Sequence, residues 1–152
     1  MPDMLVKLYE LPERPAAPTG VDLRRALAGE KHRVTAWVRQ RWGDGWASEC
    51  EVAFAREPIA CLLAVEDNDL LGFAVYDVAA RGVFGPIGVD EPARRRGVGT
   101  ALLLETMHLM RALGYAYAIV GWVGPAEWYA HAVGAAVIPD SEPGMFRGML
   151  RG

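Results

Sequence analysis

The chain has 152 residues, of which 52% are hydrophobic and 23% charged, a composition typical of one folded domain with a single core. The formal net charge of −3 at pH 7 argues against a nucleic-acid-binding protein, because such proteins are usually basic. The N-terminus has no basic segment followed by a long apolar run, and the most apolar stretch, 115–126, is too short to span a bilayer. We expect a cytoplasmic protein that binds neither nucleic acid nor membrane. Cys50 and Cys61 belong to no metal-binding pattern, so we expect reduced, buried thiols and no metal.

The first half of the chain predicts short strands around a pair of helices. The expected elements are strands over 5–11 and 21–26 and helices over 30–42 and 46–56. The connector at 12–20 contains three prolines. Gly43 and a turn at Asp44-Gly45 are expected to separate the two helices. We therefore divide the chain into an N-terminal strand with a proline-rich connector, 1–20, and a single domain, 21–152.

The second half predicts three consecutive strands, followed by alternating helices and strands. The expected strands are 60–65, 70–78, 81–89, 116–123, 135–138 and 145–150, and the expected helices are 100–113 and 126–133. Pro86 has no N–H to donate to a sheet, so we expect a bulge or a break within strand 81–89. The order of elements from residue 21 is β-α-α-β-β-β-α-β-α-β.

The turn that precedes helix 100–113 is the most informative feature of the chain. Arg94, Arg95 and Arg96 supply positive charge, and Gly97 and Gly99 leave the backbone open to a ligand. A helix that begins here adds free N–H groups and the positive end of its dipole. The turn is therefore expected to bind an anion such as a pyrophosphate, and the alternative is an arginine-rich surface turn.

The spacing Arg94-x-x-Gly97-x-Gly99 after a strand that ends at Val89 resembles the acetyl-CoA pyrophosphate loop of the GNAT superfamily of N-acetyltransferases. A dinucleotide-binding loop would need a third glycine at position 102, where the chain has Leu102, and no P-loop sequence is present. The resemblance covers about residue 21 to the C-terminus. It implies that acetyl-CoA is bound by the following residues: Ile87, Gly88, Val89, Arg94, Arg95, Arg96, Gly97, Val98, Gly99 and Thr100.

The same resemblance implies an α+β fold with a central, mostly antiparallel twisted sheet and helices on both faces. In that family the strand before the loop and the strand after the next helix splay apart, and the pantetheine arm of CoA lies between them. Here the arm would run along 84–89, opposite 118–123. The alternative is an ordinary edge strand. Members of the family often form dimers, so a homodimer is an expected assembly.

Tyr129 is the candidate catalytic acid. The run from Gly124 to Ala135 resembles the second GNAT motif, in which an aromatic-Tyr pair precedes a glycine and the tyrosine reaches the CoA sulfur. Here the spacing from Tyr129 to Gly134 is one residue longer than usual, and Ala135 replaces an aromatic residue. The alternative role of Tyr129 is packing.

No general base stands out in the sequence. Strand 81–89 has no carboxylate or histidine, and Glu127, His131, His32 and His108 are expected to be solvated or structural.

Acceptor contacts in this fold usually come from the first two helices. Trp42 and Trp46 are the candidates for an aromatic wall, with Asp44 or Glu49 holding the cationic amine. The alternative is that both tryptophans are packing residues.

These features predict an acetyl-CoA-dependent N-acetyltransferase that moves the acetyl group to a primary amine of a small molecule or peptide. Direct attack in a ternary complex is the mechanism that the resemblance implies. An acyl-CoA-binding or sensing domain without catalysis is the alternative, because the strand carboxylate is missing and the second motif is altered.

Overall fold

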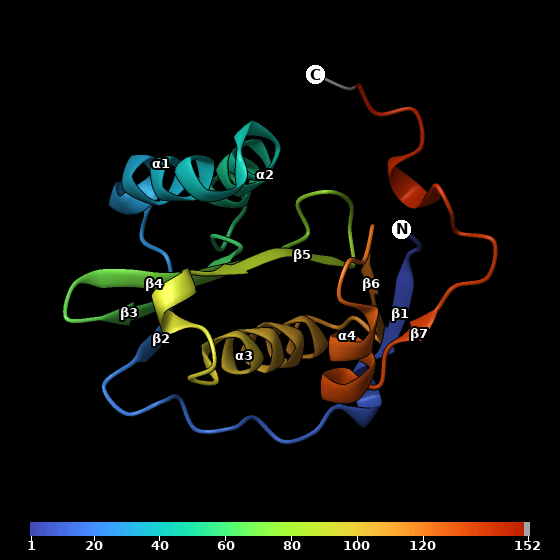
Figure 1. Ribbon diagram of the computed structural model, residues 1–152, viewed down its shortest axis with the longest axis horizontal. Coiled ribbons are helices and arrows are strands. Elements are labelled where there is room, and N and C mark those ends of the chain that lie inside the picture. Colours follow the sequence, from blue (N-terminus) through green and yellow to red (C-terminus); the bar gives the residue numbers. More distant parts are fainter. Residues whose placement is uncertain (151–152) are drawn as a thin grey trace.

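The computed structural model describes residues 1–150. One mixed β-sheet forms the centre of the molecule (Figure 1). Its seven strands lie in the order β2-β3-β4-β5-β6-β1-β7. The strands are β1 (Met4–Lys7), β2 (Asp22–Arg25), β3 (Cys61–Glu66), β4 (Asp69–Tyr76), β5 (Val83–Val89), β6 (Tyr117–Val120) and β7 (Ala136–Val137). Pairing is antiparallel except between β5 and β6. The predicted α+β class with a mostly antiparallel sheet is confirmed.

Helices cover both faces of this sheet. The pair α1 (Lys31–Trp42) and α2 (Asp44–Phe54) lies on one face, and α3 (Val98–Ala112) and α4 (Ala126–Val133) lie on the other (Figure 1). The apolar side of α3 is fully buried at Leu102, Leu103, Met107 and Met110, where it packs under the sheet. No helix within residues 1–150 is long and apolar enough to cross a bilayer.

The sheet opens between β5 and β6. These strands pair only at Val83 with Ile119 and at Phe84 with Val120. Beyond Phe84, β5 stays beside β4, whereas β6 ends at Val120. The register between β4 and β5 shifts opposite Pro86, as the missing N–H predicts, so the expected bulge is confirmed. The result is a V-shaped gap in the middle of the sheet.

Strand β1 lies inside the sheet rather than beside it. It pairs antiparallel with β6 through Met4 to Lys7 and with β7 through Met4 and Leu5. The residues that follow, Leu8–Glu10, form a 3-10 turn where a longer strand was expected. The connector then runs beneath α3, where His108 Nε2 lies 2.7 Å from the carbonyl oxygen of Pro12.

Two further sequence-based expectations are wrong. Asp44-Gly45 is the first turn of α2 rather than a separate turn, because Gly43 with φ of 93° makes the bend between the helices alone. Residues 145–150 form no strand; Gly144–Phe146 is a 3-10 turn that is held by side chains instead of a ladder. Cys50 and Cys61 are free and buried, as expected.

Candidate functional site

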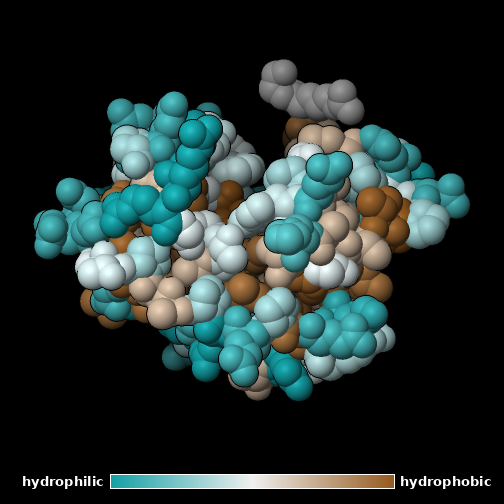
Figure 2. Space-filling view, turned by 60° about the horizontal axis from the view of Figure 1, so that its bottom comes forward, coloured by the Kyte–Doolittle hydropathy of each residue, from teal (hydrophilic) through white to brown (hydrophobic). Residues whose placement is uncertain are grey.

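A cavity of about 850 Å³ occupies the gap between β5 and β6. Most of its walls come from four parts of the chain: the splayed strands, the start of α4, one side of α2 and the C-terminal segment, defined here as residues 141–150. The surface is hollowed between the lobe that carries α1 and α2 and the lobe that carries β1 and β7 (Figure 2). Gly99 in the first turn of α3 also lines the cavity, so the cavity reaches the arginine-rich turn.

The arginine-rich turn presents a row of free backbone donors. The N–H groups of residues 95–100 donate to no acceptor within residues 1–150; the first N–H of α3 with a partner is that of Ala101, which bonds the carbonyl of Gly97. A helix start normally leaves four such groups, and here the turn before it adds more. Gly97 makes this geometry by adopting φ of 83°. An anion is the ligand that such a set of donors fits.

The three arginines have different surroundings. Arg96 forms a double hydrogen bond with Glu66 at 3.0 and 2.7 Å, which holds the pKa of that carboxyl below its usual value. Arg94 Nε donates to the carbonyl of Val89 at 3.1 Å and so fastens the turn to the end of β5. Arg95 is exposed and has no ion-pair partner within residues 1–150. Within residues 1–150 the Arg95 guanidinium and the two terminal nitrogens of Arg94 are therefore free to meet an anion.

The edge of β5 that faces the gap also has free donors. Asp90 donates to the carbonyl of Leu71 at 2.7 Å, and Gly88 faces Phe73 in the same register. Because hydrogen-bonding direction alternates along a strand, the N–H groups of Ile87 and Val89 point away from β4 and toward β6. Position 88 has no room for a side chain, because the Trp42 ring lies 2.5 Å from where a Cβ on Gly88 would be.

Tyr129 lines the cavity from α4. The residue is 5% exposed, and its ring packs edge-on against Phe84 and Trp128. Its hydroxyl has no hydrogen-bond partner within residues 1–150. Every fully enclosed polar side-chain atom in these residues does have a partner, so the Tyr129 oxygen is not fully enclosed and opens onto the cavity. Burial raises the pKa of the Tyr129 hydroxyl, which keeps it protonated at neutral pH.

Helix α2 brings Trp46 and Glu49 to the cavity, three residues apart and on one face of the helix. Burial raises the pKa of Glu49, and no nearby charge contributes to that shift. Asp44 does not line the cavity; it is exposed and pairs with Arg39 at 3.1 Å. Trp42 lies beside the cavity, stacked on Trp46, where it supports β5 at Gly88.

The C-terminal segment forms the remaining wall, with Phe146 and Met149 lining the cavity. Buried Asp3 holds this segment, because its carboxylate accepts the N–H of Trp122 at 3.1 Å and that of Met145 at 2.8 Å. The indole of Trp122 in turn donates to the carbonyl of Pro143.

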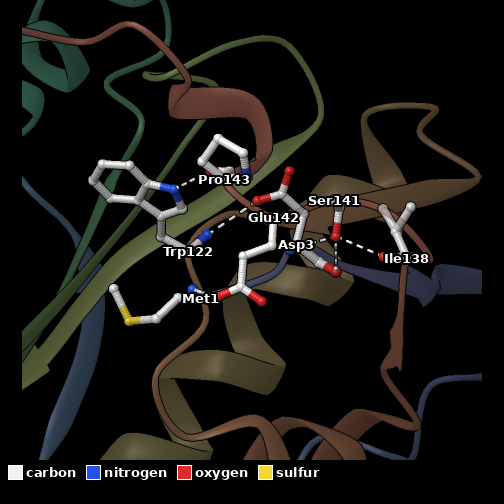
Figure 3. Close-up of polar contacts among 7 residues, drawn as sticks. All are labelled: Met1, Asp3, Trp122, Ile138, Ser141, Glu142 and Pro143. Carbon is white, nitrogen blue, oxygen red and sulfur yellow. Dashed lines mark hydrogen bonds and ion pairs between the residues drawn. The ribbon is translucent and has the colours of Figure 1, made fainter.

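Figure 3 shows Asp3 facing Trp122 and the Ser141 hydroxyl; this hydroxyl accepts the Asp3 N–H and donates to the Ile138 carbonyl. The figure also shows the amino group of Met1 paired with Glu142. The sequence did not indicate this wall, because the contacts that tie it to Asp3 and Met1 join residues more than 100 positions apart.

The other titratable candidates lie elsewhere. Glu127, His131 and His32 are exposed and do not line the cavity. Within residues 1–150 no cluster of three or more His, Cys, Asp or Glu side chains is arranged to hold a metal ion.

A protein-family model described as "Acetyltransferase (GNAT) family" matches residues 27–134. Among solved structures, a GCN5-related N-acetyltransferase from Sphaerobacter thermophilus is 24% identical with a TM-score of 0.69, over 90% of this chain and 48% of that chain. A GCN5-related glucosamine N-acetyltransferase region of a fungal multi-domain β-N-acetylglucosaminidase is 13% identical with a TM-score of 0.72, over 90% of this chain and 19% of that chain.

A third structure is the GNAT family N-acetyltransferase YhbS from Escherichia coli in complex with CoA. It is 19% identical with a TM-score of 0.59, over 79% of this chain and 71% of that chain. At these identities the likeness shows the fold. The chain spans about half the length of the Sphaerobacter protein and a smaller part of the fungal one. No curated protein matches the sequence.

Proposed function

The chain belongs to the acetyltransferase (GNAT) family, and we propose that it transfers an acetyl group from acetyl-CoA to a primary amine of a small molecule or peptide. The observation that carries this proposal is the row of unpartnered N–H groups at residues 95–100, which leads through Gly99 into the cavity between the splayed strands. A long ligand with an anion near one end and a reactive group at the other fits this arrangement.

In this proposal the N–H groups of the turn and the Arg95 guanidinium bind the pyrophosphate of acetyl-CoA. Thr100 and Val98 contribute through their backbone, and Gly97 and Gly99 let the phosphates approach closely. The pantetheine arm then lies along β5 and takes the place of the missing strand partner, where the N–H of Val89 donates to it. The complex of YhbS with CoA supports this use of the fold.

The reaction is direct attack of a neutral amine on the thioester carbonyl, as the C–N bond forms and the C–S bond breaks. The N–H of Ile87 donates to the carbonyl oxygen as negative charge develops there. The Tyr129 hydroxyl gives its proton to the departing sulfur, a role suited to a group that burial keeps protonated. Positioning within the cavity supplies much of the remaining acceleration.

Turnover tests the proposal. The purified chain is incubated with acetyl-CoA and a panel of primary amines, CoA thiol release is followed, and the acetylated amine is identified by mass spectrometry. Amine-dependent thiol release with a matching product supports the proposal. Acetyl-CoA binding without turnover of any amine would instead support an acyl-CoA-binding domain, and the absence of both would refute the proposal.

A further inference from the structure

The cavity has a part that the acyl-CoA path does not need. The turn at 94–99 lies at the start of α3, on one side of the sheet, whereas α2 and the C-terminal segment lie on the other side (Figure 1). A pantetheine arm that enters from the turn and passes between β5 and β6 ends near Tyr129. The wall formed by Trp46, Glu49, Phe146 and Met149 is then left for the acceptor.

The described part of this acceptor wall carries one charged side chain. Among the lining residues within 1–150, Glu49 is the single carboxylate, and there is no lysine, arginine or histidine. The other ionisable groups that line the cavity are the Tyr129 hydroxyl and the amino group of Met1, which pairs with Glu142. Glu49 itself has no ion-pair or hydrogen-bond partner within residues 1–150, so its charge is not compensated by the protein. A half-buried, uncompensated carboxylate favours a cation and disfavours a second carboxylate.

Apart from the Ser48 hydroxyl on α2, the rest of the wall is apolar and aromatic. Trp46 precedes Glu49 by three residues on the same helix face, so an ammonium held by the carboxylate also lies within reach of the indole ring. Phe146, Met149 and Trp122 supply apolar surface from the other side. Thioether and aromatic side chains of this kind pack against a ring or an alkyl chain and offer no partner to a polar substituent.

We propose that Glu49 binds the amine of the acceptor and accepts its proton, and that the acceptor is a primary monoamine with an apolar or aromatic body and no carboxylate. This inference rests on the proposed acetyl transfer. One ammonium proton passes to Glu49 and then to solvent, which frees the nitrogen lone pair to form the C–N bond. The second proton that the nitrogen loses replaces the one that Tyr129 gives to the CoA sulfur. The net products are the N-acetyl amine, CoA and one proton.

The matched substrates are phenylethylamine and phenylalanine, which differ by one carboxylate. We expect kcat/KM to be at least about 100-fold higher for phenylethylamine, because the carboxylate of phenylalanine would face Glu49. Equal values, or a preference for phenylalanine or for a polar diamine such as diaminopropane, would overturn the inference and leave the proposed acetyl transfer standing.

The matched variants are Glu49→Gln and, as control, Glu51→Gln at an exposed site on the same helix. Wild-type kcat/KM for phenylethylamine should rise with pH as Glu49 ionises, at a pH above the usual pKa range of a glutamate. Glu49→Gln should abolish that rise and lower kcat/KM by at least about 100-fold. Glu51→Gln should match wild type. An unchanged pH profile in Glu49→Gln would refute the role of Glu49.

A binding measurement separates this inference from the proposed reaction. Calorimetry with phenylethylamine and the CoA-bound protein should give saturable binding that weakens at least tenfold in Glu49→Gln. Binding of this kind without turnover would refute the transfer reaction but support the amine site. Turnover of other amines without binding of phenylethylamine would refute the amine site but support the transfer reaction.

Discussion

Replacing Tyr129 by phenylalanine removes one hydroxyl from the cavity and little else. The ring keeps its edge-on contacts with Phe84 and Trp128, whose ring centroids lie 6.4 and 4.8 Å away. Because the hydroxyl has no partner within residues 1–150, its removal leaves no donor or acceptor stranded. We therefore expect the free energy of unfolding to change by less than about 1 kcal/mol.

The kinetic effect should be much larger than this. General acid catalysis contributes about 10²–10⁴-fold, and a tyrosine whose pKa is raised by burial is a weak acid, so the lower end of that range applies. The expected loss in kcat is about 100-fold, which corresponds to about 2.7 kcal/mol of transition-state stabilisation. Affinity for CoA should stay unchanged, because the hydroxyl acts only on the developing thiolate.

Initial rates of CoA thiol release at saturating acetyl-CoA give kcat, and calorimetry gives the affinity for CoA. A kcat within about threefold of wild type would refute the acid role and leave Tyr129 as a packing residue. The pH dependence adds a check. Since burial raises the pKa of Tyr129, the hydroxyl should cause no loss of rate as pH rises from neutral toward the usual tyrosine value of 10.0. Above that value the unfolded chain ionises before the folded one, so the buried hydroxyl should begin to lower the free energy of unfolding only there.

Three further substitutions test the structure around the site. Asp3→Ala removes the acceptor of two backbone N–H groups and should lower the free energy of unfolding by about 3 kcal/mol and raise KM for the amine, as measured by urea denaturation and initial rates. Gly88→Ala places a Cβ 2.5 Å from the Trp42 ring and should cost about 1–3 kcal/mol, seen as a lower melting temperature. Glu30→Gln breaks the paired hydrogen bonds to Arg24, at 2.8 and 2.6 Å, that hold the pKa of Glu30 at about 2. The wild-type advantage of about 1 kcal/mol should be present above the usual value of 4.5 and disappear as pH falls through about 2, in urea denaturation across that range.

Each of these substitutions has a control or a contradicting result. Gly45→Ala adds a Cβ with nothing within 4 Å inside α2, so it should keep or raise the melting temperature; an equal loss in Gly45→Ala and Gly88→Ala would contradict the Trp42 contact. An Asp3→Ala protein with normal KM would show that the C-terminal segment does not shape the acceptor wall. A difference between wild type and Glu30→Gln that persists below pH 2 would contradict the ion-pair explanation.

Local signals in the sequence were enough to predict much of the fold. The helix at 126–133 has the bounds that the sequence predicts, because Pro125 precedes it and Gly134, in the left-handed region with φ of 68°, ends it. Pro86 similarly marked the bulge at which the sheet opens, since its effect depends only on a missing N–H. Features of this kind are set by neighbouring residues along the chain.

The acceptor wall was less predictable because it depends on tertiary contacts. Whether Asp44 or Glu49 faces the cavity depends on how α2 is rotated on the sheet, and the stacking of Trp42 on Trp46 and the contact of Trp42 with Gly88 help to set that rotation. The engagement of Arg96 by Glu66, on a strand thirty residues away, likewise has no local signal. The arginines and glycines made the turn recognisable in the sequence, but they did not show which arginine is engaged by Glu66.

Calorimetric titration with acetyl-CoA tests the anion-binding turn and the splayed strands most directly. Wild type should bind saturably, and adenosine 3′,5′-bisphosphate, which lacks the pyrophosphate, should bind much more weakly. Gly97→Trp should lose the binding, because the indole would cover the free N–H groups, while circular dichroism confirms that the fold persists despite the strain at φ of 83°. No saturation at millimolar acetyl-CoA, or equal affinity in wild type and Gly97→Trp, would contradict the assignment of the site.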